Sequence, residues 1–562
     1  MLEYPHGHRD INELKWLKVM PNLLTLYYMT KLYLYCKYSL FRIIFLLSFL
    51  ELGLNVYAST PYTSYTTKLS RFTRFNFNDT TKRYDIQKAD LSIHRKKSFI
   101  RAASETFGMN MSLWAFDRYV LKGHYAYISW KSIKENFKHG FEWDNDHLNT
   151  NMFAHPYNGS LFFNAGRSNG FNFWQSELFA IGGSAMWEMF MECERPSTND
   201  IIATPIGGAA LGEVFYRTSD RILDDRTTGG ERLGRELASF LISPMKGVTR
   251  LITGQAWKKS RSSGREYDHL PFNIDVSLGA RMLTYHDDDA KFKVGTSARL
   301  NIEYGDPFDA DSKIPYDYFT CMAEFNIMET QPLLSRVEII GRLLSKELID
   351  SKHCDLSVGL FQHFDFFDSD TISDRIPNVI EPCVVPYKLG TPASVGVGSI
   401  FRYQKNRSTL AAYAHFNGVL LGGILSDNYR YYNRNYNWAT GFSVKFGLKG
   451  NFWDDRLSVA LKNHYYRFYT READSTIDVD WTDTPDGKPV NIAGDNSIGS
   501  FYHMEGQVDY RLWKQLFVTT RFDFYSRSTK YREMIYVDNW GASDWYIDSK
   551  QMSLQLMLTC KF

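Results

Sequence analysis

The chain has 562 residues, of which 65 are basic and 63 are acidic, so its charges nearly cancel. Because it also has no long run of one sign, nucleic acid is not expected as a partner. Aromatic residues make up 16% of the chain although its mean hydropathy is -0.35. A transmembrane β-barrel requires this combination, since only alternate residues face lipid and aromatic girdles line both interfaces.

Residues 1–58 are predicted to form a Sec signal peptide. Basic residues precede the apolar run 43–50, and the segment ends in small residues at Ala58, which is a cleavage pattern. The alternative is a membrane anchor, but the apolar run is far shorter than the ~20 residues that a spanning helix needs. Residues 1–28 lengthen the signal oddly, and we expect the true start at Met29 or Met20.

A polar linker is expected over 59–100 and a helical domain over 101–265. Within this domain no window reaches 18 uncharged apolar residues, and a more apolar helix would stop in the inner membrane during export. The domain is therefore expected in the periplasm, in the barrel lumen or at the membrane surface. Helical spacing of apolar residues predicts helices within 112–121, 129–143, 176–194, 198–223 and 229–250.

Two glycine pairs in this domain have the spacing of closely packed helices. Gly166 and Gly170 are four residues apart, and so are Gly208 and Gly212. Small residues at this spacing let two helix backbones touch. The pattern predicts close helix packing rather than a ligand site.

Glu188 and Glu192 are expected one helical turn apart, among Trp, Met and Phe residues. Two carboxylates at this spacing can bind a metal ion or divide acid and base roles between them. They can also form a solvated face, or be buried and paired with Arg195 or Arg217. We favour the buried ion pair.

The segment "RPSTND" separates two expected helices. Pro196 ends the first helix, Ser197 or Asn199 can cap the second, and Asp200 suits the positive first turn. Glu213 and Arg217 have the spacing of an ordinary helix salt bridge. These structural roles are favoured, but the same residues also belong to a candidate polar cluster, which comprises His155, Glu188, Glu192, Asp200, Glu213 and Arg217.

The stretch 143–160, "WDNDHLNTNMFAHPYNGS", contains Asp144, Asp146, His147 and His155, which are potential ligands of a divalent cation. Their spacing matches no ligand pattern, so we favour a loop that caps the next helix. No cofactor is predicted, and a divalent cation here is the alternative. The chain has no GxSxG, HExxH, P-loop or dinucleotide motif, which argues against an enzyme without excluding one.

Apolar and polar residues alternate repeatedly from 266 to 562. The pattern predicts an antiparallel transmembrane β-barrel of about twelve strands, and roughly 25 residues per strand and connection suit spanning strands of ~9–11 residues. The predicted fold is α+β: a signal peptide, a helical domain and this barrel. Strands are expected to begin at or near Phe272, Phe292, Phe319, Leu333, Leu356, Ala393, Leu410, Trp438, Leu457, Phe501, Leu516 and Ser553.

The last ten residues, "SLQLMLTCKF", alternate apolar and polar side chains, with Met557 as the exception. This segment resembles the terminal strand of Gram-negative outer-membrane barrels, whose final aromatic residue is read by the barrel-insertion machinery. A soluble sandwich can also end on a strand. With the signal peptide, however, Phe562 predicts the bacterial outer membrane as the location and the insertion machinery as a partner.

A set of motifs in the helical domain resembles a known family. They are similar to motifs of the bacterial envelope family catalogued as domain of unknown function 3943. The residues concerned are "WDND" from Trp143, "HPYNGS", "FNAGRSNG" and "PSTNDIIATPIGGAALGE", together with Asn151, Trp174, Trp187, Glu188, Glu192 and Arg217. The resemblance covers roughly residues 100 to 225. It implies an outer-membrane location and no particular activity.

We therefore expect an outer-membrane barrel with a helical plug or periplasmic domain and outer-membrane lipid as a partner. The favoured role is non-enzymatic, in transport, lipid handling or envelope assembly. One alternative is a lipid-modifying enzyme that uses the Glu, Asp and His cluster of the helical domain. Another is a purely structural, plugged barrel.

Overall fold

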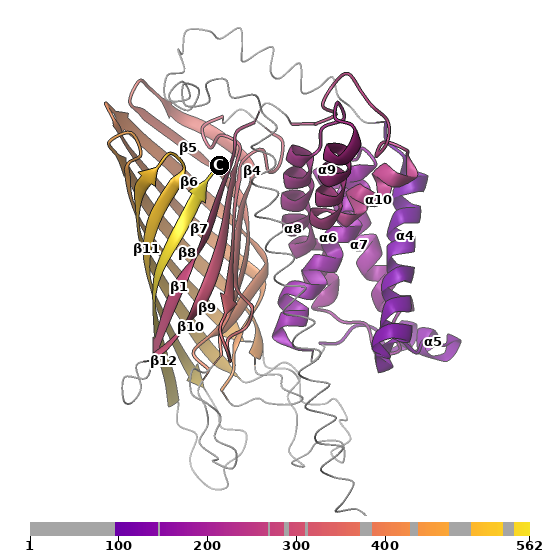
Figure 1. Ribbon diagram of the computed structural model, residues 1–562. Coiled ribbons are helices and arrows are strands. Elements are labelled where there is room, and N and C mark those ends of the chain that lie inside the picture. The colour runs from indigo at the N-terminus through magenta and orange to yellow at the C-terminus, as the bar shows by residue number, and fades with distance from the viewer. Residues whose placement is uncertain are drawn as a thin grey trace, which may run out of the picture. The chain divides into compact units, whose positions relative to one another are not determined.

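The computed structural model describes residues 96–143, 146–267, 270–285, 292–309, 313–370, 385–427, 436–470, 496–531 and 545–562. The predicted signal peptide, most of the predicted linker and Asp144 lie outside these described residues. Two parts follow one another along the described chain: helices, and then a closed barrel of strands (Figure 1).

The helical part begins at Phe99 and ends at Ile252. Serine and asparagine caps start two of its helices, since Ser129 and Asn172 each form a capping box with the residue three positions on. Its helices are α4 (Phe99–Phe116), α5 (Trp130–His139), α6 (His155–Ser168), α7 (Phe173–Phe190), α8 (Asp200–Ile222), α9 (Gly229–Ile242) and α10 (Pro244–Ile252), with short turns η1 (Asp117–Leu121), η2 (His124–Ala126) and η3 (Thr150–Ala154).

The loop predicted over 143–160 is wrong, because η3 and α6 make most of this stretch helical. "HPYNGS" looks like a turn, but Pro156 occupies the first turn of α6, where a missing N–H leaves no helix bond unmade. Gly159 is a contact residue rather than a breaker, since a Cβ on it would lie 1.8 Å from the Thr204 carbonyl oxygen of α8.

Glycine brings α6 and α8 into backbone contact. A Cβ on Gly208 would lie 2.5 Å from the Gly159 carbonyl carbon, and one on Gly212 would lie 2.8 Å from the Phe163 ring. The predicted pair Gly208 and Gly212 therefore faces α6. Gly170 does not pack in this way, because it lies in the turn after α6 at a φ of 85°, where a side chain is disfavoured.

The strands close into one antiparallel barrel in which each strand pairs with its neighbours in sequence and β1 pairs with β12. This confirms the predicted fold, a helical region followed by a barrel of about twelve strands. The strands are β1 (Phe272–Tyr285), β2 (Phe292–Tyr304), β3 (Phe319–Ile327), β4 (Leu334–Asp350), β5 (Cys354–Asp368), β6 (Lys388–Lys405), β7 (Ser408–Leu425), β8 (Tyr436–Phe452), β9 (Leu457–Thr470), β10 (Ser497–Trp513), β11 (Leu516–Tyr531) and β12 (Trp545–Lys561).

The two ends of the barrel differ in their connections. The end that holds Phe272 and Phe562, here called the terminal end, has tight turns at 351–353, 406–407, 453–456 and 514–515 and one longer connection at 305–318. The other end, here called the loop end, has the long connections 369–387, 426–435, 471–496 and 532–544.

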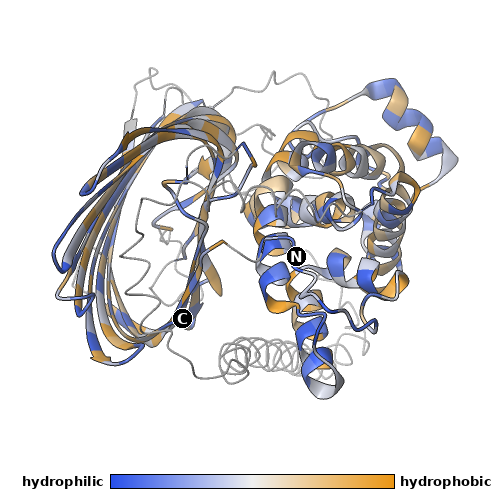
Figure 2. Ribbon diagram, turned by 90° about the horizontal axis from the view of Figure 1, so that it is seen from above, coloured by the Kyte–Doolittle hydropathy of each residue, from blue (hydrophilic) through white to orange (hydrophobic). Residues whose placement is uncertain are grey.

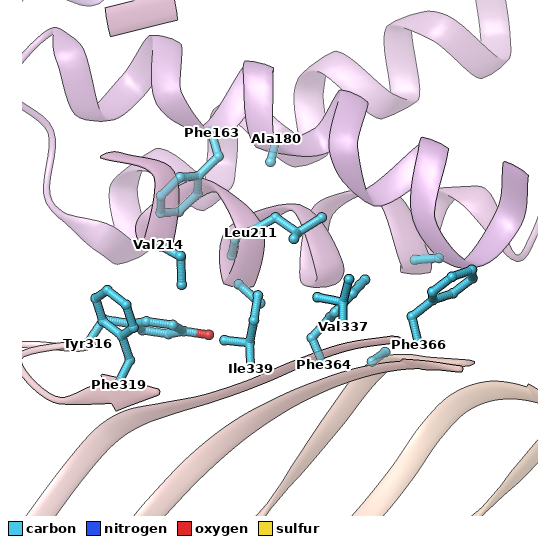
Figure 3. Packing of buried hydrophobic residues seen from close by; sticks show 14 of the residues in the cluster. Phe163, Ala180, Leu211, Val214, Tyr316, Phe319, Val337, Ile339, Phe364 and Phe366 are labelled. Carbon is cyan, nitrogen blue, oxygen red and sulfur yellow. The ribbon is translucent and has the colours of Figure 1, made fainter. Parts of the chain in front are cut away.

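The helices pack against the outer wall of the barrel, as the view along the barrel shows (Figure 2). Leu211 and Val214 of α8 face Val337 and Ile339 of β4 in one buried apolar cluster (Figure 3). Gln362 of β5 also donates to the Ile206 carbonyl oxygen at 2.8 Å. Among the described helices, none has both the length and the apolar character needed to cross a membrane.

Candidate functional site

Three helices bring His155, Glu188 and Asp200 together at the loop end of the helical part. His155 opens α6, Glu188 lies in the last turn of α7, and Asp200 opens α8. The His155 Nε2 lies 3.6 Å from Asp200 Oδ2 and 3.9 Å from Asp146 Oδ2. These are ion-pair distances that exceed a good hydrogen bond, and Asp146 belongs to the segment that leads into η3.

Glu188 is almost completely buried, with 2% of its surface exposed. One of its oxygens accepts the Ser197 backbone N–H at 2.7 Å. Burial, followed by the neighbouring charges of Asp200 and Glu192, raises the pKa of Glu188 well above its usual range, although His155 opposes this. A carboxyl group that keeps its proton beside a carboxylate and an imidazole is suited to acid–base chemistry.

The i,i+4 spacing predicted that Glu192 shares a helix face with Glu188. This prediction is wrong, because α7 ends at Phe190. Glu192 lies in the following loop, where its carboxylate accepts a hydrogen bond from the Trp187 indole. Burial raises the pKa of Glu192 to about 7, with His155 and Trp187 opposing the shift.

The arginine partners predicted for the Glu188–Glu192 pair lie elsewhere. Arg195 pairs with Glu142 at 2.8 Å near the surface, and Arg217 pairs with Glu213. The buried ion pair predicted for Glu188 is therefore wrong. The reason is that the loop after α7 turns Arg195 outwards, whereas Arg217 lies near the opposite end of α8.

A small cavity lies among these groups. Its volume is about 10 Å³, which is room for about one water molecule. The Thr204 hydroxyl is almost fully buried and has no hydrogen-bond partner among the described residues. The lining residues are His155, Asn158, Phe162, Ser184, Trp187, Glu188 and Thr204.

Glu213 and Arg217 form a separate centre toward the C-terminal end of α8. Glu213 accepts bonds from Arg217 at 2.7 Å and from Arg167 at 2.7 and 3.0 Å. The two arginines thus supply the counter-charge of this fully buried carboxylate. Arg217 also donates to the Pro315 carbonyl oxygen in the connection between β2 and β3. The predicted i,i+4 pair thus gains a second arginine and a bond to the barrel.

Charged side chains outside the predicted polar cluster fill the barrel lumen. Arg336 of β4 donates to Glu505 of β10 at 2.8 Å, and Arg299 of β2 donates to the same carboxylate at 3.0 Å. Arg281 pairs with Glu324 at 2.7 Å. We call this set the lumen network: Arg281, Arg299, Glu324, Arg336, Glu338, His464, His503, Glu505, Arg521 and Asp523, all buried.

The described part of the chain has three groups of potential metal ligands. Each group consists of three residues whose ligand atoms lie within 4.8 Å of one another. None of them includes Asp146 or His155, the weak cation candidates of the sequence. The two groups in the lumen network already carry arginine counter-charges, since Arg336 bonds both Glu338 and Glu505. The groups are Glu338–His464–His503, His503–Glu505–Asp523, and Glu347–Asp350–Asp355.

Residues 140–245 match the model of a family described as Domain of unknown function (DUF3943). The match confirms the predicted resemblance, and it covers the helices that form the candidate site. No curated protein is significantly similar to the chain in sequence.

Among solved structures, outer-membrane and transport proteins are similar to about half of the chain. OmpT, an outer membrane protein of Vibrio cholerae, is 8% identical with a TM-score of 0.21, covering 52% of this chain and 99% of that chain. An anion-selective porin from Comamonas acidovorans is 8% identical with a TM-score of 0.19, covering 52% and 99%. The Pseudomonas putida toluene transporter TodX is 7% identical with a TM-score of 0.19, covering 52% and 88%. Likenesses this low say nothing about the function of this chain.

Proposed function

We propose that the protein is an integral outer-membrane protein whose barrel is a sealed anchor. In this proposal the helical part on the outer wall of the barrel carries the function, which is lipid handling. The two faces of the strands support the membrane location. On β12, Leu554, Leu556 and Leu558 are 45–59% exposed on the outside, whereas Ser553 and Gln555 point into the buried lumen. Apolar side chains outside and polar ones inside are typical of strands that face lipid, and a closed barrel leaves no backbone edge unpaired there.

The connections support an orientation. Outer-membrane barrels have short periplasmic turns and longer extracellular loops, so the terminal end is assigned to the periplasm and the loop end to the outside. Phe562 joins the barrel seam, because its backbone N–H donates to the Ile274 carbonyl oxygen at 2.8 Å. It is the residue through which we propose that the insertion machinery recognises the chain.

The bond between Arg336 and Glu505 carries the proposal of a sealed barrel. β4 and β10 lie on opposite sides of the ring of strands, and the 2.8 Å bond between them crosses the lumen. A solute would have to separate buried charges, and removing one partner of such a pair costs about 3–5 kcal/mol. Transport through the lumen is therefore disfavoured, and the helical part becomes the functional element.

Reconstitution tests this proposal. The purified full chain is inserted into planar lipid bilayers, and insertion is verified by the heat-modifiable gel mobility of barrels. We expect inserted protein with no stepwise ionic conductance. A stable conductance from inserted wild-type protein would contradict the sealed barrel, and a soluble, heat-insensitive protein would contradict the membrane location.

Lipid modification by an enzyme is a second candidate function, favoured by the convergence of His155 and Glu188 on one cavity, with Asp200 beside His155. In this scheme Asp200 orients His155 as the base, and protonated Glu188 is the acid. The test compares the membrane lipid profile of cells that carry the wild-type chain, His155→Ala or Asp200→Asn, with Glu231→Gln as the surface control. An altered mass of one lipid class in both site variants, but not in the control, supports the enzyme. Unchanged profiles would rule it out.

A further inference from the structure

The exposed surface of the helical part is mostly apolar between its two ends. In α4 and η1, every charged residue between 99 and 121 is at least partly buried, and the exposed positions carry apolar residues, Ser or Gly. On α7 the exposed positions are likewise uncharged. We call the following set the apolar belt: Phe99, Ile100, Phe107 and Phe116 of α4, Trp174, Leu178 and Ile181 of α7, Leu233, Leu237 and Leu241 of α9, and Leu251 and Ile252 of α10, which are 44–80% exposed.

The belt lies on the outermost helices. α8 is the layer next to the barrel, and α6 lies behind it with 11 of its 14 residues buried. The helices that carry the belt pack against α6 or α8. They also contact one another, as the bond from Thr249 of α10 to Glu105 of α4 and the packing of Phe99 against Phe179 illustrate. No other described part of the chain covers these side chains, so an apolar surface of this extent marks an interaction site.

The helical part extends along the barrel wall from the loop end to the terminal end. At the loop end, Asn151 donates to the Tyr436 hydroxyl at the start of β8. At the terminal end, Arg217 reaches Pro315. Between these points α8 runs along the wall for 23 residues, or roughly 35 Å at 1.5 Å per residue, against ~30 Å of hydrocarbon in a bilayer. The wall residues that α8 covers would otherwise face lipid.

Charged residues gather at the two ends of the belt. At the loop end, α5 exposes Lys131, Lys134 and Lys138 beside Trp130, which is 87% exposed. Its Asn136 holds it to the backbone oxygen of Glu192 at 3.2 Å. Such a basic amphipathic helix suits the headgroup layer of anionic lipids. At the other end, exposed Lys258, Lys259 and Arg261 follow Trp257, which is 72% exposed.

We infer that the apolar belt contacts the acyl chains of the outer membrane, so that the helical part is a lipid-embedded flank of the barrel and α5 lies among the headgroups of the outer leaflet. The inference rests on the proposed function, because it needs the barrel in the membrane. The belt then continues the apolar outer face of the strands, and the charges at its two ends meet the two interfaces. The His155–Glu188–Asp200 site, which α5 adjoins, is thereby assigned to the level of lipid headgroups.

Photolabelling of the wild-type chain tests the inference. The protein is reconstituted in phosphatidylethanolamine–phosphatidylglycerol vesicles that carry a diazirine on an acyl chain, and labelled peptides are identified by mass spectrometry after irradiation. We expect label on the outward leucines of β12 and on the belt residues of α4, α7 and α9.

The two proposals fail differently in this experiment. Label on β12 but not on the belt would overturn the lipid-embedded flank and leave the membrane barrel standing. Absence of label from β12 would overturn the membrane barrel and the flank with it. Label on the exposed lysine face of α5 at the same level as on Leu178 would also overturn the inference, because the acyl-chain probe would then not distinguish the belt from the headgroup layer.

Discussion

Arg336 on β4 donates to the carboxylate of Glu505 on β10 at 2.8 Å, and both side chains are about 1% exposed. The two strands lie on opposite sides of the closed barrel. The bond therefore braces the barrel and blocks its lumen at the same point. The same bond therefore stabilises the fold and supports the proposal that the lumen is sealed.

Arg336→Ala tests this bond. Arg336→Ala removes a guanidinium that also serves Glu338, although Arg299 and Lys462 still neutralise Glu505. We expect a loss of roughly 3 kcal/mol in the free energy of unfolding, measured as a lower temperature of conversion between the folded and unfolded gel bands. Arg407→Ala is the matched control, because the Arg407–Asp454 pair is 78% and 65% exposed. Equal conversion temperatures for both variants would contradict the buried brace.

Glu213→Gln tests the ion centre between the helices and the barrel. The substitution leaves the buried Arg167 and Arg217 without their shared negative charge, and we expect a loss of about 3–5 kcal/mol. The readout is the temperature at which protease begins to cut the helical part while the barrel stays folded. Glu231→Gln breaks a surface pair with Arg235 and should cost less than about 1 kcal/mol. A protease threshold for Glu213→Gln as high as that of the control would refute the role of this centre.

Gly208→Ala tests the contact between α6 and α8. Its methyl group would lie 2.5 Å from a backbone atom of Gly159, and such overpacking costs about 1–3 kcal/mol. Gly182→Ala is the control, because nothing lies within 4 Å of its Cβ position and alanine is the better helix former by about 1 kcal/mol. We expect lower protease resistance of the helical part for the first variant and unchanged or higher resistance for the second. The reverse order would contradict the backbone contact.

The pH dependence of stability tests the environment of Glu192. Burial is the main cause that raises its folded-state pKa from 4.5 to about 7. Between these two pH values the folded state therefore binds a proton that the unfolded state has lost. The stability linked to this proton is complete below pH 4.5 and is lost as the pH rises to about 7. Thermal unfolding of the helical part should therefore shift to lower temperature across this window, and Glu192→Gln should weaken the shift. An equal shift in the variant would show that other groups cause it.

Much of the barrel was predictable because strand alternation is a local signal. The outward positions of Leu554, Leu556 and Leu558 follow directly from the period of two, and Met557, the exception to the alternation, points inward and is buried. The lumen network was not predictable, since Arg336 and Glu505 are 169 residues apart. Their contact depends on the register of every strand between them.

The candidate site shows the same division. Ser197 as a cap and Asp200 in the first turn of α8 were predictable from helix chemistry, and Ser197 does accept the Asp200 backbone N–H at 3.3 Å. The helix spacing of Glu188 and Glu192 misled because α7 ends between them. The meeting of His155 with Asp200 depends on α6, a helix hidden by the turn-like residues of "HPYNGS". Arg167, the second partner of Glu213, lies on that same helix.

Two phenylalanines on the outer wall of the barrel show whether the helical part covers it in the membrane. Phe364 is fully buried, and a Cβ on Gly207 of α8 would lie 3.3 Å from its ring, whereas Phe446 of β8 is 42% exposed. The photoreactive analogue p-azidophenylalanine replaces each residue in turn in membrane-inserted protein, and cross-linked products are identified by mass spectrometry. We predict that position 364 captures α8 peptides near Gly207 and that position 446 captures lipid. Capture of lipid at position 364 would show that the helical part does not cover this wall, contrary to the structure.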